Sequence, residues 1–364
     1  MRNALLSIPI LLCSTAFAYS QAVLEGFPDS YAETIKAATE EGEVKIYTTT
    51  DIGEMGDLLD AFKARFPGIN VEYADSGSAE IYSKITAETA TGQTADLIWS
   101  STMNLIMDLV ETGYAAEYES PVSPMLPDWA KYKNLAYGTT SEPLVFAYNK
   151  RLVPAEDVPT SRADIIKLAT EKTDEYRGKI TMSAVASGMF GYMVYTSELK
   201  KDKEGTLALL GALGKAEVKT YNGSGTLIEK LASGEHVIGL NLIGSYLNTR
   251  QKTDPNLGLI FPSDYTTVMS RVAFVPHAAK NPNAGRLFLD FLLSKEGQTL
   301  LTQRSMYPVR TDMTTDASFL IPGQSEVPAD KFYPIAIDTA LSDSMKPEVR
   351  VELLEQYKNL TGTQ

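Results

Sequence analysis

Apolar and polar positions along the first hundred residues follow two different periods. Residues 43–49, 69–73 and 96–99 have the patterns of short strands, whereas residues 54–66 and 79–91 carry apolar side chains at helical spacing. A Pro-Gly pair directly after the first of these helices marks its end. This order of strand, helix, strand, helix, strand with short connections predicts an open, mainly parallel sheet flanked by helices.

The pattern continues beyond residue 140 and indicates a second α/β unit. Buried strands are expected at 144–148, 179–184, 237–242 and 257–262, and an apolar helix at 189–199. The chain has 364 residues, which exceeds the roughly 250–300 residues at which a single core stops growing. The sequence therefore predicts two lobes.

The last hundred residues are expected to return to the first unit through a strand at 272–276 and a helix at 284–293. We therefore place lobe 1 at 19–140 and 268–364 and lobe 2 at 141–267. Two crossings between the lobes imply a hinge. A long C-terminal helix over about 347–360 is expected to pack against lobe 1.

Residues 1–18 have the pattern of a secretory signal peptide. Arg2 supplies the charged start, residues 4–12 are apolar, and Ala16-Phe17-Ala18 resembles a cleavage site. The apolar stretch is too short to remain as a membrane anchor. Lipidation of Cys13, the only cysteine, is an alternative, but the large Leu12 does not suit it. We expect a cleaved signal peptide and a periplasmic mature chain without disulfides.

Acidic residues outnumber basic ones, and the formal net charge is −13. Nucleic acids and anionic membranes attract clustered Lys and Arg, so neither is expected as a partner. A small anionic ligand remains compatible with this charge, because local hydroxyl and amide groups are able to hold it. Apolar residues make up 44% and charged residues 22% of the chain, which is typical of a globular protein.

Polar side chains follow each of the first three expected strands, at the ends where ligands bind in parallel sheets. A further Ser-Gly pair opens the expected helix at 189–199, where free backbone N–H groups are able to receive an anion. Single hydroxyls at such places are often helix caps, but we expect their convergence to form one crevice. The residues concerned are Thr49, Thr50, Asp51, Ser76, Ser78, Ser101, Ser187 and Gly188.

Five short motifs in a fixed order, at 41–44, 75–80, 94–97, 145–149 and 282–298, resemble those of bacterial periplasmic solute-binding proteins of ABC importers. Within that superfamily the chain is similar to the branch that contains ferric-ion, 2-aminoethylphosphonate and sugar-phosphate binders. The resemblance implies a type II fold with two lobes that close on a small-molecule solute. It also implies delivery to an inner-membrane ABC permease, a monomer, no catalysis and no cofactor.

Ferric iron is one possible solute for this branch, whose iron binders use an adjacent tyrosine pair. At those positions this chain has Ile243 and Gly244, and Tyr246 stands alone. A trivalent cation needs several anionic oxygen ligands, so this set is poor. His236 and His277 are expected to be ordinary surface or turn residues, and no resident metal site is expected. Ferric binding stays as the alternative.

An organic anion or zwitterion is the preferred solute. Arg271 is the expected bidentate partner of its phosphonate, phosphoester or carboxylate group, with a surface salt bridge as the alternative role. Asp51 and Glu80 are acceptors that suit an amine, and Tyr246 is expected to stack on the solute or pack in the core.

A secreted hydrolase is the competing class. Ser187 and Ser224 are the serines next to glycine that a nucleophile would need, but neither lies in the Gly-x-Ser-x-Gly pattern of a nucleophile elbow. We therefore expect no enzymatic activity.

Overall fold

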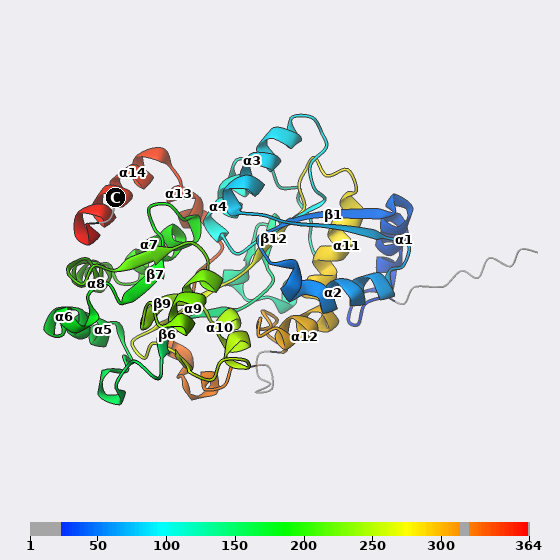
Figure 1. Cartoon of the computed structure of the whole chain (residues 1–364). Helices are drawn as coiled ribbons and strands as arrows, with labels where there is room; N and C mark the ends of the chain where they lie inside the picture. The colour runs from blue at the N-terminus through cyan, green and yellow to red at the C-terminus, as the bar shows by residue number, and fades with distance from the viewer. Residues whose placement is uncertain (1–22, 314–319, 363–364) are drawn as a thin grey trace, which may run out of the picture.

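The computed structural model describes residues 23–313 and 320–362. The expected signal peptide lies outside the described residues. Figure 1 shows two lobes, one built around β1, α1, α2 and α11 and the other around β7, α5, α6 and α8. Each contains one sheet.

The sheet of lobe 1 has the strand order β2-β1-β3-β12-β5-β4. The strand β1 runs parallel to β2 and β3, whereas β12, β5 and β4 are joined by antiparallel pairings. The carboxyl ends of β1, β2 and β3 therefore meet at one edge. The strands are β1 (Glu43–Thr48), β2 (Asn70–Asp75), β3 (Leu97–Ser100), β4 (Lys131–Tyr132), β5 (Ala136–Gly138) and β12 (Val272–Phe274).

The sheet of lobe 2 has the order β13-β11-β6-β9-β7-β8, with β10 paired to β6. Here β7, β8 and β9 are parallel, and β6 runs antiparallel to β9, β10 and β11. The strands are β6 (Glu142–Asn149), β7 (Ile180–Ser183), β8 (Lys219–Tyr221), β9 (Ile238–Ile243), β10 (Leu257–Ile260), β11 (Thr266–Met269) and β13 (Phe332–Pro334).

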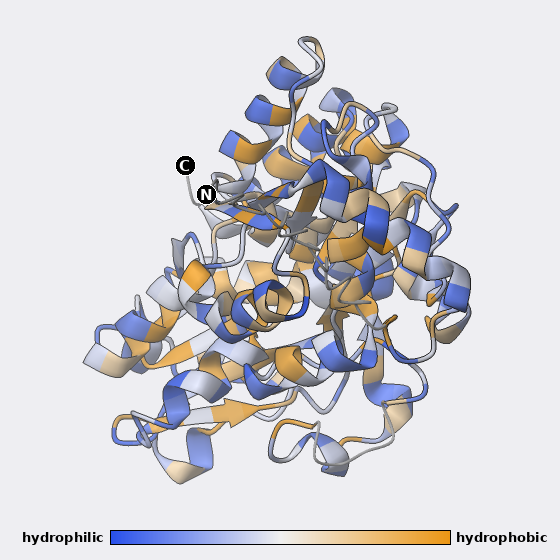
Figure 2. Cartoon of the chain, turned by 90° about the vertical axis from the view of Figure 1, so that its right-hand side faces the viewer, coloured by the Kyte–Doolittle hydropathy of each residue, from blue (hydrophilic) through white to orange (hydrophobic). Residues whose placement is uncertain are grey.

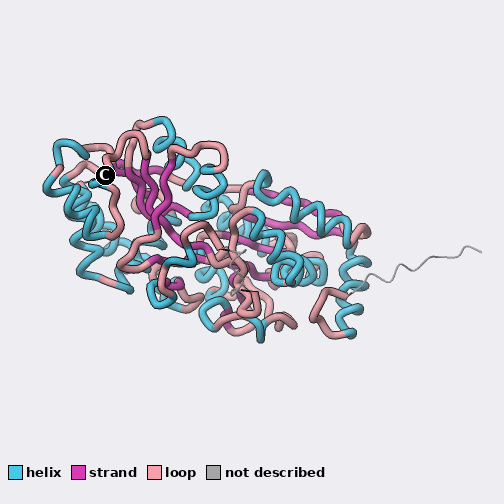
Figure 3. Tube along the Cα trace, turned by 90° about the horizontal axis from the view of Figure 1, so that it is seen from below, coloured by secondary structure: helices cyan, strands magenta, loops and turns pink. Residues whose placement is uncertain are grey.

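Helices lie outside the two groups of strands in Figure 3. In lobe 1 they are α1 (Ala32–Glu41), α2 (Ile52–Arg65), α3 (Ser78–Thr89), α4 (Met103–Glu111), α11 (Pro282–Leu293) and α12 (Lys295–Gln303). In lobe 2 they are α5 (Arg162–Glu171), α6 (Thr173–Tyr176), α7 (Met189–Lys201), α8 (Lys203–Lys215), α9 (Ser224–Ser233) and α10 (Gly244–Gln251). The chain ends with α13 (Thr339–Asp343) and α14 (Pro347–Thr361).

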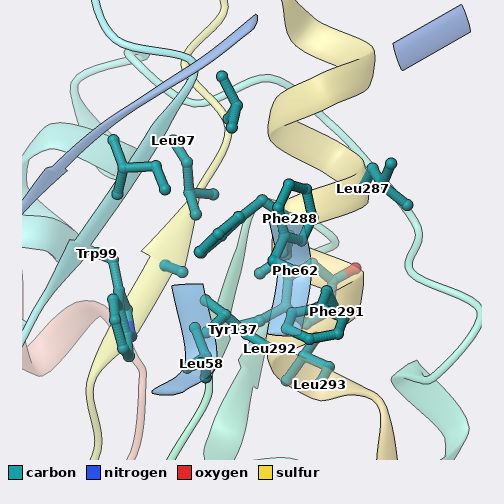
Figure 4. Close-up of a cluster of buried hydrophobic side chains, with 14 of the residues drawn as sticks. Leu58, Phe62, Leu97, Trp99, Tyr137, Leu287, Phe288, Phe291, Leu292 and Leu293 are labelled. Carbon is teal, nitrogen blue, oxygen red and sulfur yellow. The ribbon is translucent and has the colours of Figure 1, made fainter. Parts of the chain in front are cut away.

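The core of lobe 1 is centred on α11. Because most of its side chains are apolar, this helix is buried between α1 and the sheet. Phe62 of α2 meets Phe288 and Phe291 of α11 with ring centroids 4.8 and 5.3 Å apart (Figure 4). Figure 2 shows apolar residues concentrated on strands and inner helix faces and polar residues on the outer faces. Burial of these faces is the main stabilising force of each lobe.

The two-lobed α/β class is confirmed, and the sheets are mixed rather than mainly parallel. The expected position of the C-terminal helix is wrong. α14 packs against α8 of lobe 2, and the ring centroid of its Tyr357 lies 5.7 Å from that of Tyr195 on α7. Before it, β13 joins the sheet of lobe 2 beside β11, and α13 packs against α4 of lobe 1. The C-terminal segment therefore makes a third connection between the lobes.

Asp290 on α11 is a fully buried carboxyl group surrounded by hydroxyls. It accepts hydrogen bonds from the Tyr31 hydroxyl at 2.6 Å, from Ser120 at 2.5 Å and from Tyr118. Burial raises the pKa of Asp290 from 3.8 to about 6, although these hydrogen bonds act to lower it. The cluster ties the N-terminal segment and the loop before β4 to α11.

We expect this carboxyl group to make stability pH-dependent. Between its unfolded pKa and about 6, the folded state holds a proton that the unfolded state has released, so ionisation destabilises the fold. The free energy of unfolding, compared with that of Asp290→Asn, should fall by up to about 3 kcal/mol as the pH rises from about 4 to about 7. Urea unfolding at several pH values measures this difference.

Asp164→Asn is the control. Burial acts to raise the pKa of Asp164, but hydrogen bonds from Thr160 and Ser161 outweigh burial and lower that pKa. Its contribution is therefore lost only below about pH 4, and its difference from wild type should stay constant over the tested range. Parallel curves for wild type and Asp290→Asn would contradict the prediction.

Candidate functional site

The carboxyl edge of each sheet carries the starts of three helices. In lobe 1, α2, α3 and α4 begin directly after β1, β2 and β3, and in lobe 2, α7, α9 and α10 begin after β7, β8 and β9. The first turn of a helix presents free backbone N–H groups and the positive end of its dipole. Both edges are therefore suited to negatively charged groups.

Hydroxyl groups line the lobe 1 edge, as the sequence predicted. The Thr49 hydroxyl lies 3.1 Å from that of Ser100 and 3.2 Å from that of Ser101, and it accepts from the backbone N–H of Ser101 at 3.0 Å. The hydroxyls of Ser78, after β2, and Thr102, after β3, share a hydrogen bond of 2.7 Å between the two loops. These bonds hold the loops after β1, β2 and β3 in one layer.

The two edges meet across the space between the lobes. The Tyr246 hydroxyl, on the first turn of α10, donates to Asp51 at the start of α2 at 3.1 Å. Phe190 of α7 packs on a hydrophobic cluster that includes Met103 and Ile106 of α4. The crevice expected from the sequence would lie where these edges meet, at the segments 48–52, 76–78, 100–103, 186–190 and 243–246, and we call this region the interlobe crevice.

Arg271 does not have either of its expected roles. Its side chain is 1% exposed, so it neither faces solvent as a surface salt bridge nor reaches into the crevice. Its Nε and Nη2 donate to Glu142 at 2.9 and 3.4 Å, and its Nη1 donates to the Thr50 hydroxyl at 2.7 Å. Burial acts to lower the pKa of Arg271, but the Glu142 carboxylate outweighs burial and keeps the guanidinium charged.

The remaining candidates differ in their positions. Ser76 is half-buried in the loop after β2. Ser187 is exposed before α7, and Gly188 packs so closely that a Cβ there would lie 2.2 Å from the Asn222 amide oxygen. Glu80 is exposed and pairs with Lys84 one turn along α3 at 3.0 Å. That pair is a solvated helix contact, which corrects the expected role of Glu80 as an acceptor for an amine.

His236, which was expected at the surface or in a turn, lies in the short connection between α9 and β9 and is not at the surface. Its side chain is buried, with Nε2 2.8 Å from the Tyr221 hydroxyl and Nδ1 3.1 Å from the carbonyl of Gly178. Burial lowers the pKa of His236. Both ring nitrogens therefore have partners in the wall of lobe 2, and His277 is exposed as predicted.

Sequence reasoning missed two residues that organise the floor of the crevice. Glu142 is fully buried at the start of β6, and Ser245 donates to its Oε2 at 2.6 Å. Tyr73, whose hydroxyl donates to the carbonyl of Thr50 at 2.7 Å, was also missed. A charged residue directly before an apolar strand was the available signal for Glu142.

The charges around the crevice are unbalanced. Asp51, the N-cap residue of α2, and Asp75, the last residue of β2, are both exposed, and Asp75 accepts from the N–H of Ile52 at 3.0 Å. The guanidinium of Arg271 is already neutralised by Glu142. Among the described residues, no group of three or more His, Cys, Asp and Glu side chains is placed to hold a metal ion. A ligand that brings its own positive charge fits this balance.

A separate cavity of about 440 Å³ is lined in part by residues of β6, β11 and β13. Its lining is mostly apolar and includes Trp129, Val268, Tyr307 and Phe332, and it shares no residue with the sequence-predicted site. Within the part of the chain that the structure describes, no helix is both long and apolar enough to cross a membrane.

Residues 57–321 match the family model of bacterial extracellular solute-binding proteins. The chain belongs to this family. A substrate-binding protein of an ABC transporter from Agrobacterium tumefaciens has a similar structure, with a TM-score of 0.80 and 30% identity over 90% of this chain and 96% of that one. The protein is thus a bacterial extracellular solute-binding protein, similar to the substrate-binding proteins of ABC transporters.

Two further relatives carry different ligands in their names. A Salmonella typhimurium protein with the provisional name 2-aminoethylphosphonate-binding periplasmic protein is 24% identical over 70% of this chain and 74% of its own length. Iron-bound HitA from Pseudomonas aeruginosa has a TM-score of 0.70 and 20% identity, covering 87% of this chain and 99% of that one. At that identity, the likeness to HitA shows the fold alone.

Proposed function

We propose that this solute-binding protein captures a small zwitterion that carries an ammonium group and a phosphonate, phosphoester or carboxylate group. The observation that carries the proposal is the pairing of an exposed carboxylate, Asp51, with hydroxyl-lined helix starts in one crevice. The ammonium would lie against Asp51 and Tyr246. The acidic group would be held by backbone N–H groups and by the hydroxyls of Thr49, Ser78 and Ser101.

The position of the crevice between two lobes supports capture by closure. A solute that contacts both edges stabilises the closed arrangement by the contacts that it makes only there. The proposal also includes export directed by residues 1–18 as a cleaved signal peptide, and delivery of the solute to an inner-membrane ABC permease. The protein would act as a monomer. The provisional name of the Salmonella relative supports an aminoalkylphosphonate as the first solute to test.

Ferric iron is the second candidate, and the state of the tyrosines argues against it. Iron binding through tyrosine needs the deprotonated phenolate. Burial raises the pKa of Tyr246 to about 12, although the Arg271 charge acts to lower it, and burial also raises the pKa of Tyr73 well above its usual value. Removal of the proton therefore costs more at these two phenols than at an ordinary tyrosine. Among the described residues, no group of three or more His, Cys, Asp and Glu side chains is placed to complete an iron site beside them.

Thermal unfolding with a panel of 2-aminoethylphosphonate, ethylphosphonate, sugar phosphates, amino acids and ferric citrate tests the proposal. We expect 2-aminoethylphosphonate to raise the melting temperature, because a ligand that binds only the folded state stabilises it by mass action. X-ray scattering should show compaction at the same time. Ethylphosphonate, which has the same acidic group without the amine, should bind more weakly.

Asp51→Asn and Glu80→Gln form a matched pair, since both remove a carboxylate charge near a helix start in lobe 1. Asp51→Asn should weaken 2-aminoethylphosphonate binding about tenfold or more, the equivalent of about 1.4 kcal/mol, and change ethylphosphonate binding little. Glu80→Gln should leave both affinities within twofold. A panel without any stabilising zwitterion, or equal effects of the two substitutions, would reject the proposal.

A further inference from the structure

Two buried side chains of opposite charge lie on two of the segments that join the lobes. Glu142 is the first residue of β6, and Arg271 lies between β11 and β12, so each stands where the chain passes from one sheet to the other. Their side chains are 0% and 1% exposed and are joined by the Nε to Oε1 bond of 2.9 Å. The pair is therefore enclosed in the protein at the crossing point.

Each member of the pair also holds one lobe. Arg271 donates from Nη1 to Thr50, which lies in the loop after β1 of lobe 1. Glu142 accepts on Oε2 from Ser245, which lies on the first turn of α10 in lobe 2. The result is a continuous chain of hydrogen bonds from Thr50 through Arg271 and Glu142 to Ser245, which we call the hinge relay.

The residues that follow the two ends of the hinge relay face the crevice. Asp51 comes directly after Thr50, and Tyr246 comes directly after Ser245. These two residues form the exposed contact of 3.1 Å between the lobes, and the Tyr246 ring also lies 5.8 Å from the guanidinium carbon of Arg271. The buried relay and the exposed contact are thus attached to the same two backbone segments.

Both oxygens of the Glu142 carboxylate are occupied. Oε1 accepts from Thr140 at 2.9 Å in addition to Arg271, and Oε2 accepts from Ser245 in addition to Arg271. A buried ion pair contributes little net stability compared with apolar residues of similar size, but its directional bonds permit few arrangements. Its effect is therefore expected in geometry.

We propose that Glu142 and Arg271 are positioning residues, which set the spacing and orientation of the Asp51 loop relative to the first turn of α10. The hinge relay limits how far the two edges of the crevice move apart when no solute is present. The effect of this positioning on solute affinity rests on the proposed function. Its effect on the spacing of the lobes is independent of which solute the protein binds.

Spin-label distance measurements test lobe spacing without any solute. The only cysteine is Cys13, so a Cys13→Ser chain with Lys36→Cys on α1 and Lys203→Cys on α8 carries one label on each lobe at exposed positions. We expect a narrow distance distribution in this background. Glu142→Gln should at least double its width. Thr50→Val and Ser245→Ala, which each remove one end of the relay, should also widen it.

Glu198→Gln is the matched control. Glu198 pairs with Arg162 at 2.5 Å, and both side chains are buried in lobe 2 away from the crevice. This substitution should lower the melting temperature and leave the distance distribution unchanged. Unchanged widths in Glu142→Gln, Thr50→Val and Ser245→Ala, or an equal broadening in Glu198→Gln, would overturn the proposal.

The same variants separate this proposal from the proposed function. With 2-aminoethylphosphonate as the probe, the three relay variants should weaken binding at least fivefold, whereas Glu198→Gln should change it less than twofold. Broadened distributions without any binding of the probe would uphold the positioning role and reject the solute. Unchanged distance distributions in variants that bind 2-aminoethylphosphonate normally would reject the positioning role and uphold the solute.

Discussion

Glu142→Ala is expected to lower the free energy of unfolding by about 3–5 kcal/mol. The substitution leaves the guanidinium of Arg271 buried, charged and without its carboxylate partner. The Ser245 hydroxyl loses its acceptor at the same time. Urea unfolding of the variant and the wild type at one pH gives the difference directly.

The double substitution Glu142→Leu with Arg271→Met separates the cost of an unpaired charge from the value of the pair itself. Removal of both charges takes away the unfavourable state, and buried pairs replaced by apolar residues are often neutral in stability. The double variant should therefore regain most of the loss. The single variants Glu142→Leu and Arg271→Met are measured beside it. If the double variant loses as much free energy of unfolding as the two single variants together, the explanation through an unpaired buried charge is wrong.

Phe62→Ala is expected to cost about 3–5 kcal/mol, because it leaves a cavity in the core of lobe 1. Phe62 is fully buried, and its ring contacts that of Phe66 at the end of α2. Its contacts with the rings of Phe288 and Phe291 join α2 to α11 (Figure 4). The loss should appear as a lower urea midpoint.

Two variants check that the loss arises from the cavity. Phe62→Leu keeps most of the apolar volume and should cost clearly less than Phe62→Ala. Ile52→Ala removes an apolar side chain that is 54% exposed on the same helix, and it should change stability by less than about 0.5 kcal/mol. A cost below about 1.5 kcal/mol for Phe62→Ala would show that the site collapses around the smaller side chain.

The spacing of apolar residues predicted the helices and strands, because buried positions recur at a regular interval along each element. In α2, the positions expected to face inward, including Met55, Leu58, Leu59 and Phe62, are all buried. The strands at the starts of both lobes were likewise located within a residue or two. The direction of a strand in its sheet has no such local signal, which is why the positions of β6 and β12 were predicted but their antiparallel pairing was not.

Long-range pairing explains the errors at the site. Arg271 was expected to bind the solute, and its pairing with Glu142 was missed, because Glu142 lies 129 positions earlier in the sequence. Nothing in the spacing of the chain reveals such a pair. The hydroxyls of Thr49 and Ser101 were placed together by a rule about the edges of parallel sheets, and the structure brings them within 3.2 Å of each other.

Lobe 2 is completed by elements from the C-terminal segment of the chain. β13 covers the β11 edge of the second sheet, and α14 covers α8, although both come from the last forty residues of the chain. A fragment cut at residues 141–269 would expose an unpaired strand edge and an apolar helix face, both of which promote aggregation. Neither half of this protein is therefore a piece that can be expressed as one uninterrupted stretch of the gene.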